Sequence, residues 1–552
     1  MTAEDKSQAA APAAASPGAL ARALILLQLL SRLLTFGLNQ VLVRLAPPSV
    51  FGTAAIQFDL VASTILFLSR EGVRNALLRG GGSGAERSDA SKQDDDAAEA
   101  RDRGDRLSAP DAALAALPLR LGLGVASAAV ALYLYTAPSS TTSQADFYPA
   151  LALYVAAALA ELSVEPLYVR ALRASNIRVR VQAEGGMAIV RAVVACACLV
   201  ADRSGTHALL GFAAGHFAGA AWLAGRYLWE YGAPALLSTS SYNPTTYALA
   251  LANTRQSVVK HVLTEADRIA VGYISPLGDQ GGYAVAMNYG SLVARIIFQP
   301  VEETLLLHWS RALDAPATVP LLTLALRLSS HLALLLPVFV PPLLPLVLPF
   351  LLPRRYTAET SAGLTLQTYL AAYLPLLSLN GILEAFHAAS ATPAQVARQA
   401  KVMIASSGVF ALCLWALARG TIVAVTTEQA LIYASCSAML VRIAYALVHA
   451  RAVVRQQQPG SAFLKIGTVL PKWPVRIAVV VLGGLVWAAS ARLARLGDNP
   501  GPSLRNQVLL LALGGGAGAI VLGLIFVVEK ADIAAVGRAL KASSTGSTGK
   551  VD

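Results

Sequence analysis

Apolar stretches of about 20 residues recur along nearly the whole chain, and each is long enough to cross the hydrocarbon core of a bilayer. We count about fourteen such stretches by this criterion. Because a bilayer offers no hydrogen-bond partners to an open backbone, they predict an all-α polytopic membrane protein. The expected spans are residues 19–45, 50–78, 113–136, 147–170, 183–201, 207–230, 245–273, 281–307, 320–350, 361–390, 401–418, 427–450, 475–496 and 505–528.

The composition supports a membrane protein rather than a nucleic-acid-binding protein. Of the 552 residues, 55% are hydrophobic and 14% are charged, against about 25% charged residues in soluble proteins. The net charge of +12 comes largely from Lys and Arg in alternate loops. These loops are 87–106, 173–180, 398–401, 451–472 and 530–541. By the positive-inside rule, we expect these loops and both termini in the cytosol, and no nucleic-acid partner.

The spans can divide into six, six and two, as in transporters built from repeats. The expected segments are a cytosolic N-terminus at 1–17, an N-lobe at 18–230, a C-lobe at 231–450, a cytosolic loop at 451–474, two extra helices at 475–528 and a cytosolic tail at 529–552. Residues 79–110 have almost no apolar content and predict a disordered cytosolic loop inside the N-lobe. The span at 320–350 is the least regular, because prolines break or bend helices. These are Pro337, Pro341, Pro342, Pro345 and Pro349.

The span at 281–307 carries unusual polar residues for a membrane helix. They are Asn288, Arg295, Gln299, Glu302 and Glu303. Ionisable groups at membrane depth are costly and normally face a partner or a water-filled cavity. The span therefore predicts the inside of a transporter-like bundle, although the two glutamates could instead cap the far end of the helix. Pro300 is expected to bend this helix.

The first two spans also carry cations. Arg70 and Arg74 lie at i and i+4 on one helix face. Two guanidiniums on one face suit a phosphate, but a cytosolic stop-transfer cluster partly neutralised by Glu71 is the alternative. Arg32 and Asn39 belong to a polar stripe in the first span, where Arg32 could line a cavity or snorkel to the interface.

The seventh span has a polar stripe that is difficult to place facing lipid. Its members are Lys260, Thr264, Asp267 and Arg268, with Glu265 beside it. They could line a cavity or form ion pairs, such as Lys260 with Asp267 and Glu265 with Arg268.

In the tenth span, Glu384 follows Asn380 by four residues and could face the cavity or pair with a cation. Asn380 and Gly381 favour a close contact between helices.

Enzyme signatures are missing from the sequence. There is no Gly-x-x-x-x-Gly-Lys phosphate loop and no His-Glu-x-x-His, and no soluble region is large enough to couple ATP hydrolysis. We therefore expect a transporter-like protein with no catalytic residues, no metal site and no cofactor.

Eight motifs occur in order between residues 31 and 386. They are Ser31-Arg-Leu-Leu-Thr-Phe-Gly-Leu-Asn39, Phe67-Leu-Ser-Arg-Glu71, Glu161-Leu-Ser-Val-Glu-Pro166, Leu263-Thr-Glu-Ala-Asp-Arg268, Gln280-Gly-Gly-Tyr283, Asn288-Tyr-Gly-Ser-Leu-Val-Ala-Arg295, Phe298-Gln-Pro-Val-Glu-Glu303 and Asn380-Gly-Ile-Leu-Glu-Ala-Phe386. In these motifs the chain resembles the RFT family, the eukaryotic oligosaccharide-translocation proteins of the endoplasmic reticulum. It departs from the family pattern at Gly72, where alanine is common, and in the insertion at 79–110.

The resemblance implies a fold like that of the bacterial lipid II flippases and the multidrug/oligosaccharidyl-lipid/polysaccharide exporters, with two six-helix lobes around a central cavity and two C-terminal helices. It also implies translocation of dolichyl-diphosphate-linked oligosaccharide from the cytosolic to the lumenal leaflet of the endoplasmic reticulum membrane for N-glycosylation. Membrane lipid is an expected partner, and glycosylation enzymes are candidate partners. Two alternatives stay open: a non-transporting accessory protein that binds the glycolipid or the glycosylation machinery, and an ion-coupled exporter of the same fold.

A diphosphate must have its charge compensated in a low dielectric, so we expect a cationic cavity. The expected cargo-binding residues are Arg32, Asn39, Arg70, Arg74, Lys260, Glu265, Arg268, Asn288, Arg295, Gln299, Glu302 and Glu384.

Overall fold

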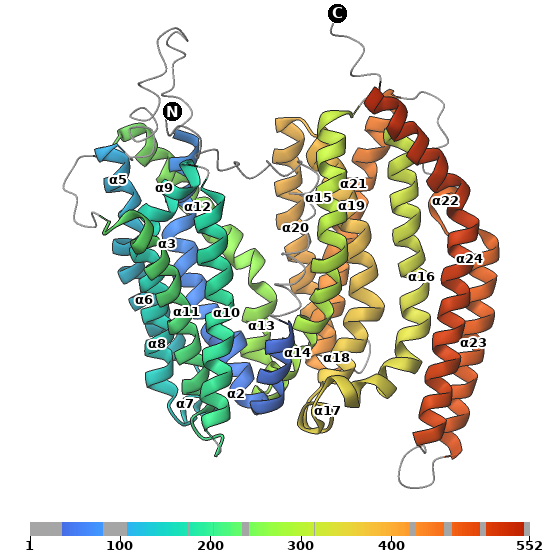
Figure 1. Cartoon of the computed structure of the whole chain (residues 1–552), viewed down its shortest axis with the longest axis horizontal. Helices are drawn as coiled ribbons and strands as arrows, with labels where there is room; N and C mark the ends of the chain where they lie inside the picture. The colour runs from blue at the N-terminus through green and yellow to red at the C-terminus, as the bar shows by residue number, and fades with distance from the viewer. Residues whose placement is uncertain are drawn as a thin grey trace, which may run out of the picture.

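A computed structural model describes residues 36–80, 108–174, 176–202, 204–234, 242–313, 315–419, 425–457, 466–496 and 504–545. These ranges are helical and contain no strand, so the predicted all-α fold is confirmed. Two helical bundles stand side by side, and a further pair of helices covers the outer side of the second bundle (Figure 1). Most of the expected span at 19–45 and most of the predicted loop at 79–110 lie outside the described residues.

The first bundle holds the N-terminal half of the chain. Residues 36–45 are helical. They are followed by α2 (Pro48–Gly52), the π-helical turn η1 (Thr53–Phe58), α3 (Asp59–Gly80), α5 (Ala109–Ala115), α6 (Leu117–Thr136), α7 (Ser139–Thr142), α8 (Phe147–Ser163), α9 (Glu165–Arg173), α10 (Ile177–Ala201) and α11 (Ala208–Tyr231). Its core is built around Phe58, whose ring lies 5.4 Å from that of Phe147 and 5.2 Å from that of Tyr154. The next helix, α12 (Pro244–Thr264), packs against α3 and so joins this bundle.

The second bundle begins after two helices, α13 (Ala266–Ile274) and α14 (Leu277–Val293), that lie between the bundles (Figure 1). Its elements are η2 (Ala294–Phe298), α15 (Gln299–Arg311), α16 (Thr318–Leu351), α17 (Arg354–Glu359), α18 (Ala362–Thr368), η3 (Tyr369–Tyr373), α19 (Leu374–Ser390), α20 (Pro393–Ala418) and α21 (Thr427–Gln457). The outer helices are α22 (Ile466–Val469), α23 (Trp473–Leu496) and α24 (Leu504–Thr545).

Among the described residues, 10 helices are long and apolar enough to cross a membrane, or 11 if the bent pair α8–α9 is one span. The protein is therefore a multi-pass membrane protein. The expected spans at 245–273 and 281–307 are helical but are not among these. The first is broken after Thr264, whereas the second is continuous and carries several polar and charged residues. In the second of them the π-helical turn η2 ends two residues before Pro300, as expected near a proline, which removes a backbone donor.

The proline-rich span at 320–350 forms one continuous helix, α16, rather than a broken one. Its five internal prolines lie in its C-terminal half, where three are only one to three residues apart. Neighbouring helices cover this region, which is the condition under which prolines are tolerated in membrane helices.

The glycines of the 280–290 motif let helices approach closely. A Cβ on Gly281 would lie 1.9 Å from the carbonyl oxygen of Pro48, and one on Gly290 would lie 2.2 Å from the ring of Tyr369. The side chain of Gln280 accepts a 2.7 Å hydrogen bond from Gln57. These contacts hold α14 against α2 on one side and against η3 on the other, so the motif fixes the helix between the bundles.

The bundles also meet at the end that carries α2, α7 and α17, the lower end in Figure 1. There Arg44 donates to the carbonyl of Phe350 at 3.0 Å, and Tyr356 donates to the carbonyl of Ala46 at 3.3 Å. At the opposite end lie α5, α9 and the C-terminal end of α24 (Figure 1). The basic residues Arg170, Arg173 and Arg538 belong to these last two helices.

Candidate functional site

Two adjoining pockets of about 380 and 630 Å³ open beside the helices that lie between the bundles. We call them together the central cavity. They share lining residues from α3, α10 and α13, namely Asp59, Glu184, Met187, Arg191 and Arg268. The wall thus comes from the first bundle and from the helices that follow it.

Six of the residues expected to bind cargo line the central cavity. They are Asn39, Arg70, Arg74, Arg268, Asn288 and Arg295. Five others line neither pocket: Lys260, Glu265, Gln299, Glu302 and Glu384. Arg32 lies outside the described residues.

Arg70 and Arg74 line the smaller pocket, and each is paired with a glutamate. Arg70 lies 3.2 Å from Glu161, and Arg74 donates to both carboxylate oxygens of Glu165 at 2.7 and 2.8 Å. Glu161 and Glu165 lie on either side of the break between α8 and α9, where the chain bends by 43°. Each arginine of the i, i+4 pair therefore meets one carboxylate.

Glu71 makes no direct ion pair with Arg70 or Arg74 among the contacts described. It accepts a hydrogen bond from Asn75 and pairs with Lys260 at 3.3 Å.

Arg191 was missed by the sequence interpretation. It comes from α10 and lies 2.8 Å from Asp59 of α3. His216 of α11 is buried beside them, stacked on Tyr154 with 4.3 Å between ring centres, and neither of its ring nitrogens has a hydrogen-bond partner among the described atoms. A lone arginine in the apolar span 183–201 satisfies the same rule that singled out Arg295, so the signal was present in the sequence.

The polar stripe of the seventh span is divided by a helix break after Thr264. Glu265 and Arg268 form the expected ion pair, at 3.3 Å. The alternative pair of Lys260 with Asp267 is wrong, because Lys260 pairs with Glu71 and Asp267 accepts from the hydroxyl of Tyr283 at 3.4 Å. A continuous helix would have placed them on one face, whereas the break turns α13 away from α12.

The remaining expected residues lie among α15, α19 and α21. Gln299 donates to Glu303 at 2.9 Å, and Glu384 pairs with Arg442 of α21. Glu302 packs over Gly381, where an added Cβ would lie 1.7 Å from its carboxylate oxygen. The close helix contact predicted at Asn380-Gly381 is therefore confirmed, and it is made by Glu302.

The lining of the central cavity balances its charges. Its cations are Arg70, Arg74, Arg191, Arg268 and Arg295, and its carboxylates are Asp59, Glu161, Glu165, Glu184 and Asp267. The excess of cations expected from the sequence is not present in these two pockets. Three of these carboxylates, Glu161, Glu165 and Asp59, pair with Arg70, Arg74 and Arg191 and hold their guanidiniums in fixed positions.

Within the described ranges, no group of three His, Cys, Asp or Glu side chains is placed to hold a metal ion.

The family model described as Rft protein matches residues 19–537. The chain belongs to the Rft family. Among its relatives, the Man(5)GlcNAc(2)-PP-dolichol translocation protein RFT1 of Schizosaccharomyces pombe is 28% identical over 70% of this chain and 74% of its own length. The protein of the same name from Eremothecium gossypii is 30% identical, with the same two shares covered.

A solved structure of the lipid II flippase MurJ in an inward closed conformation superposes on this Rft protein with a TM-score of 0.57. The match covers 91% of this chain and 98% of MurJ at 12% identity. The predicted likeness to the lipid II flippase fold is therefore confirmed, while the number of spans expected from the sequence is not.

Proposed function

We propose that this protein moves a dolichyl-diphosphate-linked oligosaccharide from the cytosolic to the lumenal leaflet of the endoplasmic reticulum membrane, for use in N-glycosylation. The observation that carries the proposal is the family match over nearly the whole chain, with relatives named for Man(5)GlcNAc(2)-PP-dolichol translocation. The flippase fold and a polar cavity beside the helices between the bundles support it.

The central cavity suits a diphosphate that exchanges with carboxylates. A guanidinium binds phosphate and carboxylate through the same fork of donors. Arg191 and Arg268 line the cavity and are paired with Asp59, on the cavity surface, and with Glu265, behind it. A diphosphate can replace either partner without leaving a bare cation in a low dielectric. Arg295 lines the same cavity and donates to Ser291. We propose these three arginines as the cargo-binding cations.

The sugars need neutral hydrogen-bonding groups. Asn39 and Asn288 line the larger pocket with Ser291, and we propose them for this role. The polyprenyl chain stays in the lipid. Arg70 and Arg74, whose glutamate partners are buried, position the wall rather than bind the cargo.

We infer an orientation with α5, α9 and the end of α24 in the cytosol, and with both termini on that side. The concentration of Lys and Arg in the loops supports it. The test is protease protection of terminal tags in sealed microsomes, where cleavage of both tags without detergent is expected. Protection of the C-terminal tag would overturn the orientation.

An accessory role that binds the glycolipid without moving it is the second candidate. It is favoured by the ion pairs of the cavity wall, which are satisfied without a cargo. Reconstitution separates the two functions. The purified protein is placed in vesicles with dolichyl-diphosphate oligosaccharide, and the arrival of the glycolipid at the opposite leaflet is timed with a sugar-binding or sugar-cleaving probe.

A translocase shortens that time, and Arg191→Gln abolishes the gain while Lys401→Gln, an exposed cation on α20, leaves it unchanged. If the protein binds the glycolipid but the glycolipid crosses these vesicles no faster than it crosses protein-free vesicles, translocation is contradicted and the accessory role is favoured. The same assay without the glycolipid, but with a proton gradient and a small cationic drug, tests the exporter alternative.

A further inference from the structure

A separate pocket of about 690 Å³ lies between the second bundle and the start of the outer helices. Its walls come from α16, α19, α21 and the segment that joins α22 to α23. They are mostly leucines and valines, including Leu334, Leu383 and Leu447. Arg451 and Arg476 also line it. The pocket shares no residue with the central cavity.

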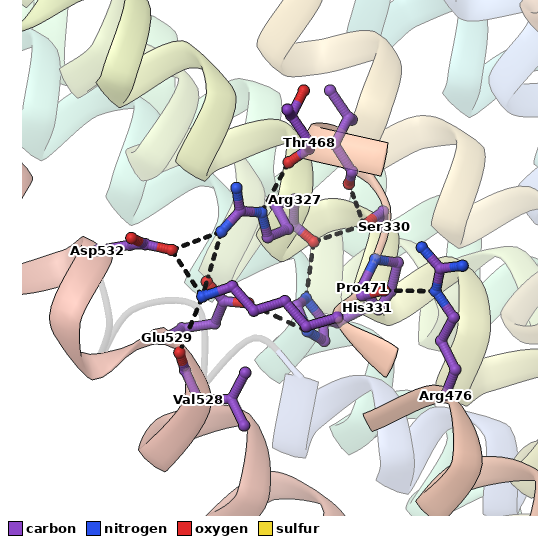
Figure 2. A network of polar contacts seen from close by, with 11 residues as sticks. Arg327, Ser330, His331, Thr468, Pro471, Arg476, Val528, Glu529 and Asp532 are labelled. Atoms are coloured by element: carbon purple, nitrogen blue, oxygen red, sulfur yellow. Dashed lines mark hydrogen bonds and ion pairs between the residues drawn. The ribbon is translucent and has the colours of Figure 1, made fainter. Parts of the chain in front are cut away.

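A polar network fixes the joining segment beside this pocket (Figure 2). Arg327 of α16 donates to the carbonyl of Thr468 at 2.8 Å and pairs with Glu529 at 2.9 Å and Asp532 at 2.6 Å. Lys472 pairs with Asp532 at 2.8 Å. These contacts bind α16, the joining segment and α24 into one unit, so the pocket has a rigid rim.

A second contact ties the rim directly to the pocket wall. Ser330, which lines the pocket, donates to the carbonyl of Val469 at 2.7 Å.

Arg476 stands apart from this network. Its Nε donates to the carbonyl of Pro471, and in Figure 2 its two terminal nitrogens point away from the acidic residues. Among the residues that the structure describes, none supplies Arg476 with a carboxylate partner within 4.0 Å. The nearby Glu529 and Asp532 are already engaged by Arg327 and Lys472. The guanidinium therefore keeps its positive charge available at the pocket.

The surroundings of Arg476 have the character of a membrane interface. Trp473, at the start of α23, is exposed and lies under the guanidinium, 5.3 Å from ring centre to Cζ. Exposed tryptophans at the ends of membrane helices lie at headgroup level. A cationic rim above leucine-rich walls matches a ligand that has a negative headgroup and hydrocarbon chains.

We propose that this pocket binds an anionic glycerophospholipid, with its phosphate on Arg476 and Arg451 and an acyl chain between α16, α19 and α21. The lipid thereby joins the outer helices to the second bundle. The proposal does not depend on which cargo the central cavity carries.

Native mass spectrometry of the full-length protein tests the proposal. The protein is purified in detergent and supplied with palmitoyl-oleoyl phosphatidylinositol or, in a parallel sample, palmitoyl-oleoyl phosphatidylcholine. We expect one phosphatidylinositol to be retained at least roughly fivefold better than phosphatidylcholine. Both lipids carry the phosphate, but the choline group brings a positive charge beside the arginines, and attraction of one Arg to a net anionic headgroup is worth about 1 kcal/mol. Arg476→Gln should remove the preference, and Arg476→Lys should keep part of it.

Two further variants keep the test decisive. Arg492→Gln removes an exposed cation from the other end of α23 and should retain the lipid as the wild type does. Ala444→Trp fills the apolar part of the pocket and should lower retention of both lipids. Equal retention of phosphatidylinositol by the wild type and Arg476→Gln would overturn the proposal, as would an equal loss in Arg492→Gln.

Discussion

The wall of the central cavity and the network around Glu529 are both made of charged side chains from apolar helices, yet their surroundings differ. In the wall, Arg191 and Arg268 keep 37% and 41% of their side chains exposed and line open space. In the network, Arg327 keeps 13% and Glu529 none, and neither lines any of the pockets described above. The same residue types therefore serve an open, exchangeable surface in one region and a closed helix joint in the other.

The burial of an ion pair at membrane depth indicates whether it supports folding or is open to a ligand. A charge in an apolar helix needs a partner or water. Where the partner is fully enclosed, as around Glu529, the pair supports folding. Where the partner faces a cavity, as for Arg191, the carboxylate can be displaced by a ligand of the same charge.

The largest effect should come from breaking the enclosed joint. Glu529→Ala leaves Arg327 and Lys472 with Asp532 alone, and loss of one partner of a buried pair costs about 3–5 kcal/mol. We expect the full-length protein to be depleted in cells and to unfold at a lower temperature, with glycosylation falling in proportion to abundance. Immunoblotting beside a glycosylation reporter measures both.

Replacing both members of the joint provides the control. Arg327→Leu together with Glu529→Leu removes one charge of each sign, and apolar replacement of a buried pair is often neutral. This double variant should regain part of the lost abundance. Normal abundance of Glu529→Ala would show that the joint is not a folding element.

The next effect should come from Arg191 in the open wall. Arg191→Gln removes a proposed phosphate contact, and loss of a hydrogen bond to a charged group slows translocation by at least about tenfold. Asp59→Asn with Arg191→Gln removes the wall pair as a whole. If Arg191 only neutralises Asp59, the double variant restores glycosylation. If it binds cargo, the double variant stays defective at normal abundance, which is the result we expect.

A partial effect should follow from changing the shape of a cation while keeping its charge. Arg295→Lys retains the positive charge in the larger pocket but loses the fork of donors. We expect translocation in vesicles to slow several-fold, while Arg295→Glu abolishes it, both with normal protein levels. Equal activity of Arg295→Lys and the wild type would mean that charge alone suffices at this position.

Much of the fold could be predicted from the sequence because membrane helices follow from apolar length alone. Helices occur at every expected span that the structure describes, including the proline-rich α16. The arrangement of charges could not be predicted in the same way. Sequence spacing relates residues on one helix, as for Glu265 and Arg268, but the partners of Arg74 and Arg191 come from other helices.

Two helix breaks lie beside the charged residues whose partners the sequence spacing did not predict. The bend between α8 and α9 lies between Glu161 and Glu165, the partners of the two arginines of α3, and the break after Thr264 separates Lys260 from Asp267. Pro166 predicts a kink at the first break, and the 43° bend confirms it. The second break does not change the apolar pattern, so hydropathy gives no signal for it. Asp59 and Glu184 lie in apolar spans, so the rule that singles out the cations applies to them as well.

The smallest effect is expected at Lys260, which the sequence placed among the central cations. It lines neither pocket of the central cavity, its side chain is 60% exposed, and its partner is Glu71 on α3. An exposed pair of this kind contributes less than about 1 kcal/mol. Lys260→Gln should therefore leave protein level and translocation within about twofold of the wild type. Lys260→Glu sets two like charges together and should reduce activity modestly, with recovery when Glu71→Lys is added. A loss as large as that of Arg191→Gln, without recovery in the swapped pair, would extend the cargo site to α12 and weaken the distinction between the open wall and the rest of the molecule.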